Sequence, residues 1–526
     1  MLPHQKQSVR IPRMHLEQRM PRIFTVTTVL IVFTLIIAST PAQTQSTAST
    51  ISSAPPNLAS ITKMLQMKLD QAQRFDKFPG AQVGFAFFSG QTSAGVPQYF
   101  SGSVASGVAD LKTNAPLKTT DRLLAGSIGK TFVAALTLRL VEEGKLDLND
   151  KIEKWLGGES WFAKLPNAKD VTLRMLLNHS SGIENIDDLE SFQKQVRKSG
   201  GRNVKYDELI SYVLNKKPLF PAGSDYHYAD TNYILVGMII EKVSGKSLYE
   251  LITERILKPY KLERTIPSDS STLPEVANGY FENKPLVVDG TFTINPQWEW
   301  AGGGFASTAE DLARWGGLLY SGSVLTPASM DEMFKSTTVG EGAGYGLGVM
   351  ISRSKWGRSY GHDGAFPGYL SDLRYYTKYN LAIAVMVNAE APGVDHFLAT
   401  AVDDFAGVII NATSKSSESE RLKIQKFAED WLNLIYAGRF DESWNQLSKG
   451  LQRRYTKENW AEMMRSSLTG LGTVTSRKLR MNYSLGAAGL VTLDFEVTFA
   501  KSPLKTETVV LDSSEGEWHI FSYARH

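Results

Sequence analysis

The chain has 526 residues and a mass of 58.2 kDa, a length that corresponds to roughly two to four domains. Its 42% hydrophobic and 21% charged residues are typical of globular proteins and exclude disordered, collagen-like and coiled-coil chains. The chain has 57 basic and 54 acidic residues. Five of the basic residues and one of the acidic residues lie in the first 42 positions, which leaves 52 basic and 53 acidic residues in the rest of the chain. This near-neutral body excludes the basic surface of a nucleic-acid-binding protein. The absence of cysteine excludes disulfides, thiolate metal sites and a cysteine nucleophile.

The N-terminal segment has the succession of regions that is typical of a secretory signal peptide. Basic residues precede an uncharged apolar run of 16 residues, Ile23–Ala38, and small residues follow it up to Ala42. A helix that crosses a bilayer needs about 20 apolar residues. We therefore expect a signal peptide at 1–42, cleaved after Ala42, and a secreted or periplasmic protein. The alternative is an uncleaved membrane anchor through residues 23–38.

Two polar segments divide the rest of the chain. A linker is predicted at 43–56, followed by a large domain at 57–412 in which strand-like and helix-like segments alternate. Apolar runs in it predict strands over Phe78–Phe88 and Leu381–Asn388, and 3.6-residue spacing predicts a helix over Lys130–Leu146.

A second linker is predicted at 413–420, before a domain at 421–526. Helical patterns come first in this domain and alternating, half-buried strand patterns follow, which indicates a small α+β domain. Its predicted elements are helices over 424–435 and 459–467 and strands over 491–499 and within 509–523.

Ser127 and Lys130 form an S-x-x-K sequence where the first predicted helix begins. The two side chains share one helix face, and the positive end of the helix dipole favours negative charge that develops on the serine. A neighbouring amine that loses its proton can act as the base. Four other S-x-x-K sequences occur in the chain, so the spacing alone is also compatible with a surface serine beside a solvated lysine.

The same segment, Gly126–Thr131, reads GSIGKT and resembles the end of a phosphate-binding loop. The full pattern needs a glycine at position 124, which is Leu124. This difference argues against nucleotide binding.

Two further positions are candidates for chemistry. Tyr228 precedes Asp230 at the start of an apolar helix; beside a cationic lysine its phenolate becomes more accessible, so that it could shuttle protons. His362 and Gly364 lie on a predicted edge strand, where the glycine permits close approach of the backbone to a ligand. The alternatives are an aromatic core residue and a turn histidine, and His179 is interpreted as structural.

In combination, these motifs resemble the serine β-lactamase and penicillin-binding-protein superfamily. The branch that is most similar holds class C β-lactamases, D-alanyl-D-alanine carboxypeptidases, D-aminopeptidases and esterases. The resemblance covers about residues 60–410 and includes VTLRMLLNHSSGI, YADTNYILVGMIIEKVSG and AGGGFASTAEDLARW. It implies an α/β (α+β) fold, with an antiparallel sheet flanked by helices plus a helical subdomain. The C-terminal region resembles small, cone-like α+β domains of the nuclear-transport-factor-like or cystatin-like kind.

The resemblance also implies roles for residues that match the motifs. Ser127 would be the acylated nucleophile, Lys130 would help to deprotonate it, and Tyr228 would relay a proton to the leaving group. His362 would shape the electrostatics around Tyr228. The backbone amides of Ser127 and Ala365 would form the oxyanion hole.

Asp230 departs from the asparagine that is commoner in this branch. An amide donates and accepts hydrogen bonds, whereas a carboxylate only accepts. Its charge would also hold Lys130 protonated. The change puts recognition of amide substrates, including β-lactams, in doubt. No glutamate can be assigned as a deacylating base, so turnover and a stable acyl-enzyme are equally open.

The sequence therefore predicts a secreted serine hydrolase that acts through an acyl-enzyme on esters or small amides, with D-amino-acid peptides and β-lactams among the candidate substrates and the cell wall as a candidate partner. The alternative is a non-catalytic cell-wall or ligand-binding protein on the same fold. No cofactor or metal is expected, because the eight histidines are scattered and form no H-E-x-x-H motif. The oligomeric state is open, and loops 184–203 and 267–296 would set specificity.

The role of the C-terminal domain is left open. It could mediate dimerisation or restrict access to the cleft. Its tryptophans could line a pocket, although four aromatic core residues are the simpler interpretation; they are Trp431, Trp444, Trp460 and Trp518.

Overall fold

The structure of the chain is a computed structural model. It describes residues 58–91, 97–199, 205–281, 284–340, 343–413, 415–485, 490–512 and 517–525. The signal or anchor predicted at 23–38 and the linker predicted at 43–56 lie outside these ranges. Within them, every helix is too short or too polar to cross a lipid bilayer.

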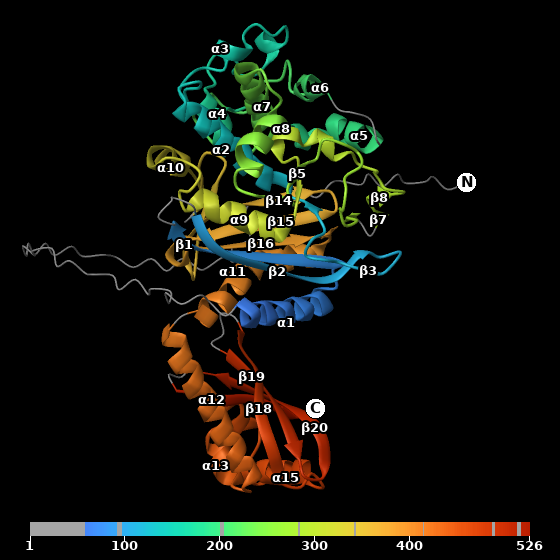
Figure 1. Ribbon diagram of the computed structural model, residues 1–526, viewed down its shortest axis with the longest axis vertical. Coiled ribbons are helices and arrows are strands. Elements are labelled where there is room, and N and C mark those ends of the chain that lie inside the picture. The colour runs from blue at the N-terminus through green and yellow to red at the C-terminus, as the bar shows by residue number, and fades with distance from the viewer. Residues whose placement is uncertain are drawn as a thin grey trace, which may run out of the picture. The chain divides into compact units, whose positions relative to one another are not determined.

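A nine-stranded antiparallel sheet forms the centre of the large domain (Figure 1). Its strand order is β11-β12-β13-β14-β15-β16-β1-β2-β3. The two strands predicted from apolar runs are confirmed as β1 and β16, which pair with Val83 opposite Val385. The bounds are β1 (Gly80–Gln91), β2 (Pro97–Asp110), β3 (Ala115–Pro116), β11 (Thr337–Gly340), β12 (Ala343–Tyr345), β13 (Met350–Ser354), β14 (Gly357–Phe366), β15 (Tyr369–Tyr376) and β16 (Leu381–Val387).

Helices cover both faces of this sheet (Figure 1). Because side chains alternate along a strand, Val83 and Phe85 pack with α1 and α11 on one face, whereas Gly84 meets α9 on the other. A Cβ atom on Gly84 would lie 2.1 Å from the Ala309 carbonyl oxygen, so this close crossing of α9 requires glycine. The bounds are α1 (Leu58–Asp76), α9 (Ala309–Tyr320), α10 (Pro327–Phe334) and α11 (Pro392–Thr413).

A helical region packs on the α9 side of the sheet, with the buried helix α2 (Gly129–Glu142) at its centre. The helix predicted here is confirmed; it ends two residues before Gly144, which has a left-handed φ of 68°. Trp315 of α9 anchors α2 by donating to Thr131 Oγ1 at 2.7 Å and stacking on Phe132. The other helices here are α3 (Glu153–Leu156), α4 (Leu173–Leu177), α5 (Glu190–Ser199), α6 (Tyr206–Ser211), α7 (Asp230–Ser244) and α8 (Leu248–Ile252).

Short elements complete the large domain. The helical turns are η1 (Gly126–Ile128), η2 (Phe162–Lys164), η3 (Ile186–Asp188), η4 (Thr253–Leu257), η5 (Pro296–Trp298), η6 (Trp300–Gly302) and η7 (Thr377–Tyr379). The short strands are β4 (Leu123–Leu124), β5 (Ile266–Pro267), β6 (Tyr280–Phe281), β7 (Lys284–Pro285), β8 (Val287–Val288), β9 (Thr291–Phe292), β10 (Phe305–Ser307) and β17 (Ala389–Glu390).

The C-terminal domain has its own apolar core, between four helices and a four-stranded antiparallel sheet. The predicted helices and strands are present, and β18 is an additional strand. The segment predicted to be a linker at 413–420 is helical from Lys415 onwards. Trp431 and Trp460 are buried in the core, as the core interpretation expects. The bounds are α12 (Lys415–Tyr436), α13 (Phe440–Asn445), α14 (Lys449–Arg454), α15 (Lys457–Leu468), β18 (Val474–Leu485), β19 (Leu490–Phe499), β20 (Ser502–Asp512) and β21 (His519–Arg525).

Candidate active site

The S-x-x-K pair lies where η1 leads into α2. Gly126 has a left-handed φ of 55°, which turns the chain into the helix at a position that favours glycine. Ser127 remains partly accessible to solvent, whereas Lys130 is fully buried. The Lys130 ammonium donates to Ser127 Oγ at 2.8 Å. The structure therefore brings the two residues into direct contact, and of the two only Ser127 has solvent-exposed surface.

Lys130 has two further partners, and together the three occupy its donors. It forms an ion pair with Asp230, the first residue of α7, and donates to the backbone carbonyl of Gly302. A Cβ atom on Gly302 would lie 3.2 Å from Asp230 Oδ1, and one on Gly303 would lie 2.7 Å from the backbone of Gly126. The glycines therefore let this loop pack directly behind the nucleophile. Sequence reasoning missed Gly302 as a partner.

Asp230 is ionised, while two nearby carboxyls resist ionisation. Burial opposes the charge of Asp230, but Lys130 and a hydrogen bond from Asp187 outweigh burial and hold the pKa of Asp230 below its ordinary value. Burial and then Asp230 raise the pKa of Asp187 well above its usual range. Burial likewise raises the pKa of Glu299, against the charge of Lys130. The lysine thus faces one carboxylate and two carboxylic acids.

Tyr228 lies over the lysine, with Lys130 Nζ 4.9 Å from the centre of its ring. Burial and then Asp230 raise the pKa of the phenol well above its ordinary value, and the Ser127 hydroxyl beside it acts in the opposite direction. The expectation that the site makes the phenolate accessible is therefore wrong, because desolvation and a carboxylate both disfavour the anion. Tyr228 is a neutral phenol suited to donate a proton.

His179 positions the segment that carries Tyr228. Its carbonyl accepts from the His227 amide at 2.9 Å, and its Nδ1 accepts from the Ala229 amide at 3.2 Å. Its ring centre is 4.3 Å from that of Tyr228. The interpretation of His179 as structural is compatible with these contacts, but sequence reasoning did not connect it to Tyr228; the LLNHSSGI motif was the available signal.

His362 is a buried, neutral histidine. Its Nδ1–H donates to the Asp363 carbonyl at 2.6 Å, since a carbonyl can only accept, and its Nε2 accepts from the Tyr345 hydroxyl at 2.8 Å. Burial lowers the pKa of His362 to about 4; Lys130 lowers it too, and Asp363 opposes them. Its ring centre is 6.1 Å from that of Tyr228, so His362 contributes a polar, uncharged wall.

The prediction that His362 and Gly364 lie on an edge strand is wrong for the strand as a whole, because β14 runs between β13 and β15. The pairing with β13 nevertheless stops at Gly361, opposite Met350. Residues 362–366 therefore have a strand partner on the β15 side only. The prediction of an edge strand therefore fits residues 362–366, although it does not fit β14 as a whole.

Gly364 and Ala365 approach the nucleophile turn closely. A Cβ atom on Gly364 would lie 2.1 Å from the Ala125 carbonyl oxygen, which accepts a hydrogen bond from Ser371 Oγ at 2.7 Å. A Cβ atom on Gly126 would lie 2.5 Å from the Ala365 nitrogen. Ala365 itself is exposed. The local edge of β14 thus borders Ser127.

Comparison with known sequences identifies the family. Residues 78–407 match the sequence model of the family described as Beta-lactamase. The chain belongs to the beta-lactamase family. Its antiparallel sheet and flanking helices are the expected β-lactamase- and transpeptidase-like fold.

Among the relatives of this beta-lactamase family member, penicillin-binding protein 4* of Bacillus subtilis (strain 168) is 27% identical over 299 residues, which cover 54% of this chain and 64% of that protein. The D-aminopeptidase of Brucella anthropi is 25% identical over 292 residues, which cover 54% of this chain and 53% of that protein. The chain thus spans less than two thirds of the length of these curated relatives.

A solved structure of a D-stereospecific amidohydrolase from Streptomyces sp. is 28% identical, with a TM-score of 0.55, and covers 65% of this chain and 98% of that one. The solved structure of the D-amino acid amidase from Ochrobactrum anthropi SV3 shares the fold, with 22% identity and a TM-score of 0.55. The match covers 68% of this chain and 99% of that one.

The C-terminal domain matches a family without a described role. Residues 427–523 match the model of a protein of unknown function, DUF4019. The nuclear-transport-factor-like or cystatin-like resemblance of this domain stays a prediction.

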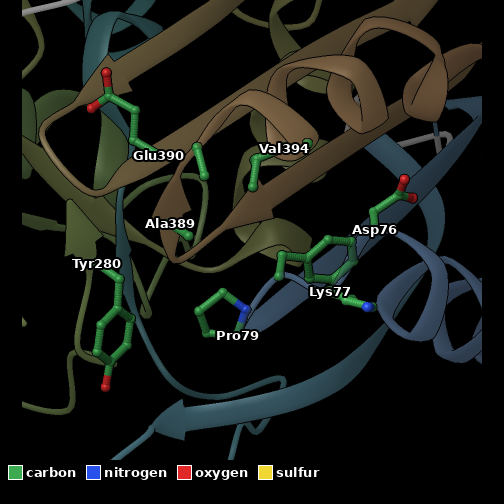
Figure 2. A pocket seen from close by; sticks show the side chains of 10 residues that line it. Asp76, Lys77, Pro79, Tyr280, Ala389, Glu390 and Val394 are labelled. Atoms are coloured by element: carbon green, nitrogen blue, oxygen red, sulfur yellow. The ribbon is translucent and has the colours of Figure 1, made fainter. Parts of the chain in front are cut away.

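Two features of the described residues bear on ligand binding. They contain no group of three His, Cys, Asp or Glu side chains arranged to hold a metal ion. A small pocket of about 70 Å³ lies where the end of α1 meets the start of α11 (Figure 2). Its labelled lining residues are Asp76, Lys77, Pro79, Tyr280, Ala389, Glu390 and Val394, and none of the candidate site residues is among them.

Proposed function

We propose that the chain is a serine hydrolase that forms an acyl-enzyme on Ser127. One observation carries the proposal: the Oγ atom of Ser127, a residue that is only partly buried, lies 2.8 Å from the nitrogen of a fully buried lysine. Membership of the beta-lactamase family supports it, as do relatives named D-aminopeptidase and D-stereospecific amidohydrolase.

The Lys130–Asp230 pair supplies the base. In the reactive form Lys130 has released a proton to solvent, and the neutral amine donates to the Asp230 carboxylate and to Gly302, which leaves its lone pair for Ser127. As Ser127 Oγ bonds to the substrate carbonyl carbon, the hydroxyl proton moves to Lys130 Nζ. Burial of the pair keeps water from competing for that proton.

Tyr228 completes the step as a proton donor. Its neutral phenol gives a proton to the leaving nitrogen or oxygen as the acyl bond breaks, and it recovers a proton from the Ser127–Lys130 side. The backbone N–H groups of Ser127 and Ala365 would stabilise the oxyanion. His362, neutral and hydrogen-bonded on both nitrogens, would hold this wall in place.

The proposed substrates are esters and small amides, with D-amino-acid peptides and β-lactams as the candidates to test first. We also propose that the chain is exported and acts in or near the cell wall, on the basis of the apolar run at 23–38. Mass spectrometry of the protein purified from an exporting bacterium tests this. A mature chain that begins at Gln43 is expected, and an intact N-terminus in the cytoplasmic fraction would contradict export.

The first experiment on activity is intact-mass analysis after treatment with a fluorophosphonate and, separately, a penicillin. Wild type should gain one fluorophosphonate adduct and Ser127→Ala none, with both proteins folded by circular dichroism. An additional penicillin adduct would favour a wall-peptidase substrate. If the folded wild type is modified by neither reagent, the non-catalytic binding protein becomes the better description, since Asp230 then keeps the lysine permanently paired.

A further inference from the structure

Tyr345, the last residue of β12, is a buried tyrosine to which the proposed mechanism gives no role. It is 1% exposed. Its ring centre lies 6.0 Å from that of Tyr228 and 4.7 Å from that of His179, and both contacts are edge-to-face. Aromatic rings attract each other in this arrangement. Tyr345 therefore packs against the candidate proton donor and against the histidine that positions its segment.

The Tyr345 hydroxyl occupies the acceptor nitrogen of His362. A neutral imidazole has one N–H group and one bare nitrogen. The Nδ1–H of His362 donates to the Asp363 carbonyl at 2.6 Å, so Nε2 is the bare nitrogen, and the Tyr345 hydroxyl donates to it at 2.8 Å. His362 has no exposed surface. Without the Tyr345 hydroxyl, Nε2 would therefore be a buried acceptor that lacks a donor, which is unfavourable.

The Tyr228 hydroxyl is a competing donor for this nitrogen. Within the described ranges its oxygen is shielded from solvent and forms no hydrogen bond. The ring centres of Tyr228 and His362 are 6.1 Å apart. Since a phenol oxygen extends beyond its ring, a hydrogen bond can form between the two residues when Nε2 is unoccupied. A Tyr228 O–H that donates to His362 is not available to a leaving group on Ser127.

The backbone fixes the position of Tyr345 from two sides. Tyr345 pairs with Met350 of β13, which pairs with Gly361 at the start of the local edge of β14. After Tyr345 the chain turns against α2. A Cβ atom on Gly348, which has a left-handed φ of 71°, would lie 3.2 Å from the Lys130 carbonyl oxygen. Tyr345 is thus held between the local edge of β14 and the helix that carries the lysine.

Building on the proposed function, we propose that Tyr345 is a positioning residue for the proton transfer from Tyr228. By donating to His362 Nε2, it keeps the Tyr228 hydroxyl free to protonate the leaving group, and its ring supports that of Tyr228. Tyr345 itself exchanges no proton with the substrate. Its effect on the rate should therefore grow with the basicity of the leaving group, because a basic leaving group needs the proton from Tyr228.

Two reagents separate proton donation from the reactivity of Ser127. A fluorophosphonate releases fluoride, a weak base that leaves without a proton, whereas phenyl acetate releases phenolate, a stronger base that benefits from one. For Tyr345→Phe we expect fluorophosphonate labelling within about twofold of wild type. Release of phenol in the first turnover should be about tenfold slower, a smaller loss than that of a general acid, because Tyr228 is still present.

The matched control is Tyr375→Phe. It removes the hydroxyl of another buried tyrosine, which donates to Asn380 at 3.0 Å, and it should change neither rate. In a His362→Leu background, Tyr345→Phe should have no further effect on phenol release, because the acceptor that the hydroxyl occupies is gone. An effect of the same size in that background would contradict action through His362.

A second measurement does not depend on activity. The ¹⁵N resonance of His362 Nε2 should move in Tyr345→Phe, because this nitrogen loses the hydroxyl that donates to it. In Tyr375→Phe the resonance should stay in place.

The possible failures are distinguishable. If the fluorophosphonate does not label folded wild type, the proposed function itself fails. If wild type is labelled but releases no phenol from phenyl acetate, the proton transfer that Tyr345 is proposed to support does not take place, and this inference alone is overturned. It is also overturned if Tyr345→Phe, folded by circular dichroism, slows both reactions equally or neither, or if the Nε2 resonance does not move.

Discussion

The chain contains two buried ion pairs that look alike and differ in what surrounds the cation. In the large domain Lys130 pairs with Asp230. In the C-terminal domain Arg525 donates to the fully buried Glu507 at 3.0 Å. Tyr436 and Tyr523 also donate to Glu507, and the Arg525 guanidinium lies over both rings.

The third partner of each cation separates a candidate reactive site from a structural one. Lys130 contacts the hydroxyl of Ser127, a residue that is partly exposed, whereas Arg525 contacts the Ser467 carbonyl. A lysine amine can give up its proton, and an arginine does not within proteins. Burial of an ion pair is therefore weak evidence for chemistry until a nucleophile is found on it.

The largest effect should follow from removing the lysine. Lys130→Met should slow acylation of Ser127 by about 10²- to 10⁴-fold, the range expected when a general base is lost. The rate of fluorophosphonate labelling measures this. The matched control is Lys63→Met, since Lys63 is the exposed lysine of another S-x-x-K sequence. Equal loss in both variants would contradict a specific role for Lys130.

Breaking the other pair should cost stability and spare labelling. Glu507→Ala leaves the Arg525 charge without its partner, so the free energy of unfolding of the C-terminal domain should fall by about 3–5 kcal/mol. Denaturant unfolding followed by tryptophan fluorescence measures it. Glu462→Ala, on an exposed glutamate of α15, serves as control. If Glu507→Ala abolished labelling of Ser127 in folded protein, the separation drawn between the two pairs would be wrong.

Acid should weaken the large domain through His362. The folded pKa of His362, about 4, is below the ordinary 6.5, so the unfolded chain binds the proton more readily between these values. The contribution of His362 to the free energy of unfolding is fully present above about pH 6.5, and it decreases by about 3 kcal/mol as the pH falls to 4. Asp187 and Glu299, with raised pKa values, act in the opposite direction.

Chemical unfolding of wild type and His362→Asn at pH 7 and pH 4 isolates the histidine. The gap in stability between the two proteins should narrow by about 3 kcal/mol on acidification. His396→Asn, on an exposed histidine of α11, is the matched control. A gap that stays constant across this range would contradict a neutral, buried His362.

The smallest effects should come from one helix cap in each domain. Thr308 caps α9 by accepting from the Asp311 amide, and Thr456 caps α15 by accepting from the Asn459 amide. Replacing either threonine with alanine should cost about 1 kcal/mol. Each cost should appear in the unfolding of its own domain, because the two domains have separate apolar cores. Thermal unfolding monitored by calorimetry would show whether one transition moves at a time.

Sequence reasoning located elements with a strong periodic signal. The continuous apolar run of β16 and the alternation in β19 each predicted a strand, and the Ser127–Lys130 spacing predicted a contact that the structure contains. It missed β18, whose sequence VTSRKLRMNYSL mixes charged and apolar residues without clean alternation. Its alternation of apolar and polar residues is too irregular to distinguish a strand from a polar loop.

Other features of the site were beyond sequence reasoning for physical reasons. Gly302 contributes a backbone carbonyl. Since every residue type has one, the residue type at this position does not predict the contact. The raised pKa of Tyr228 depends on desolvation and on the carboxylate of Asp230, which come together only in the folded chain. Asp187 resembles any loop aspartate until the fold places it against Asp230.

The complete burial of Lys130 also makes it a reporter of opening motions. Amine-reactive reagents will modify surface lysines in the native protein and spare Lys130, which has no exposed surface. A protein with acetylated surface lysines should therefore keep its reactive serine. Slow modification of Lys130 over hours would then measure how often the region around α2 opens, at a single position in the chain.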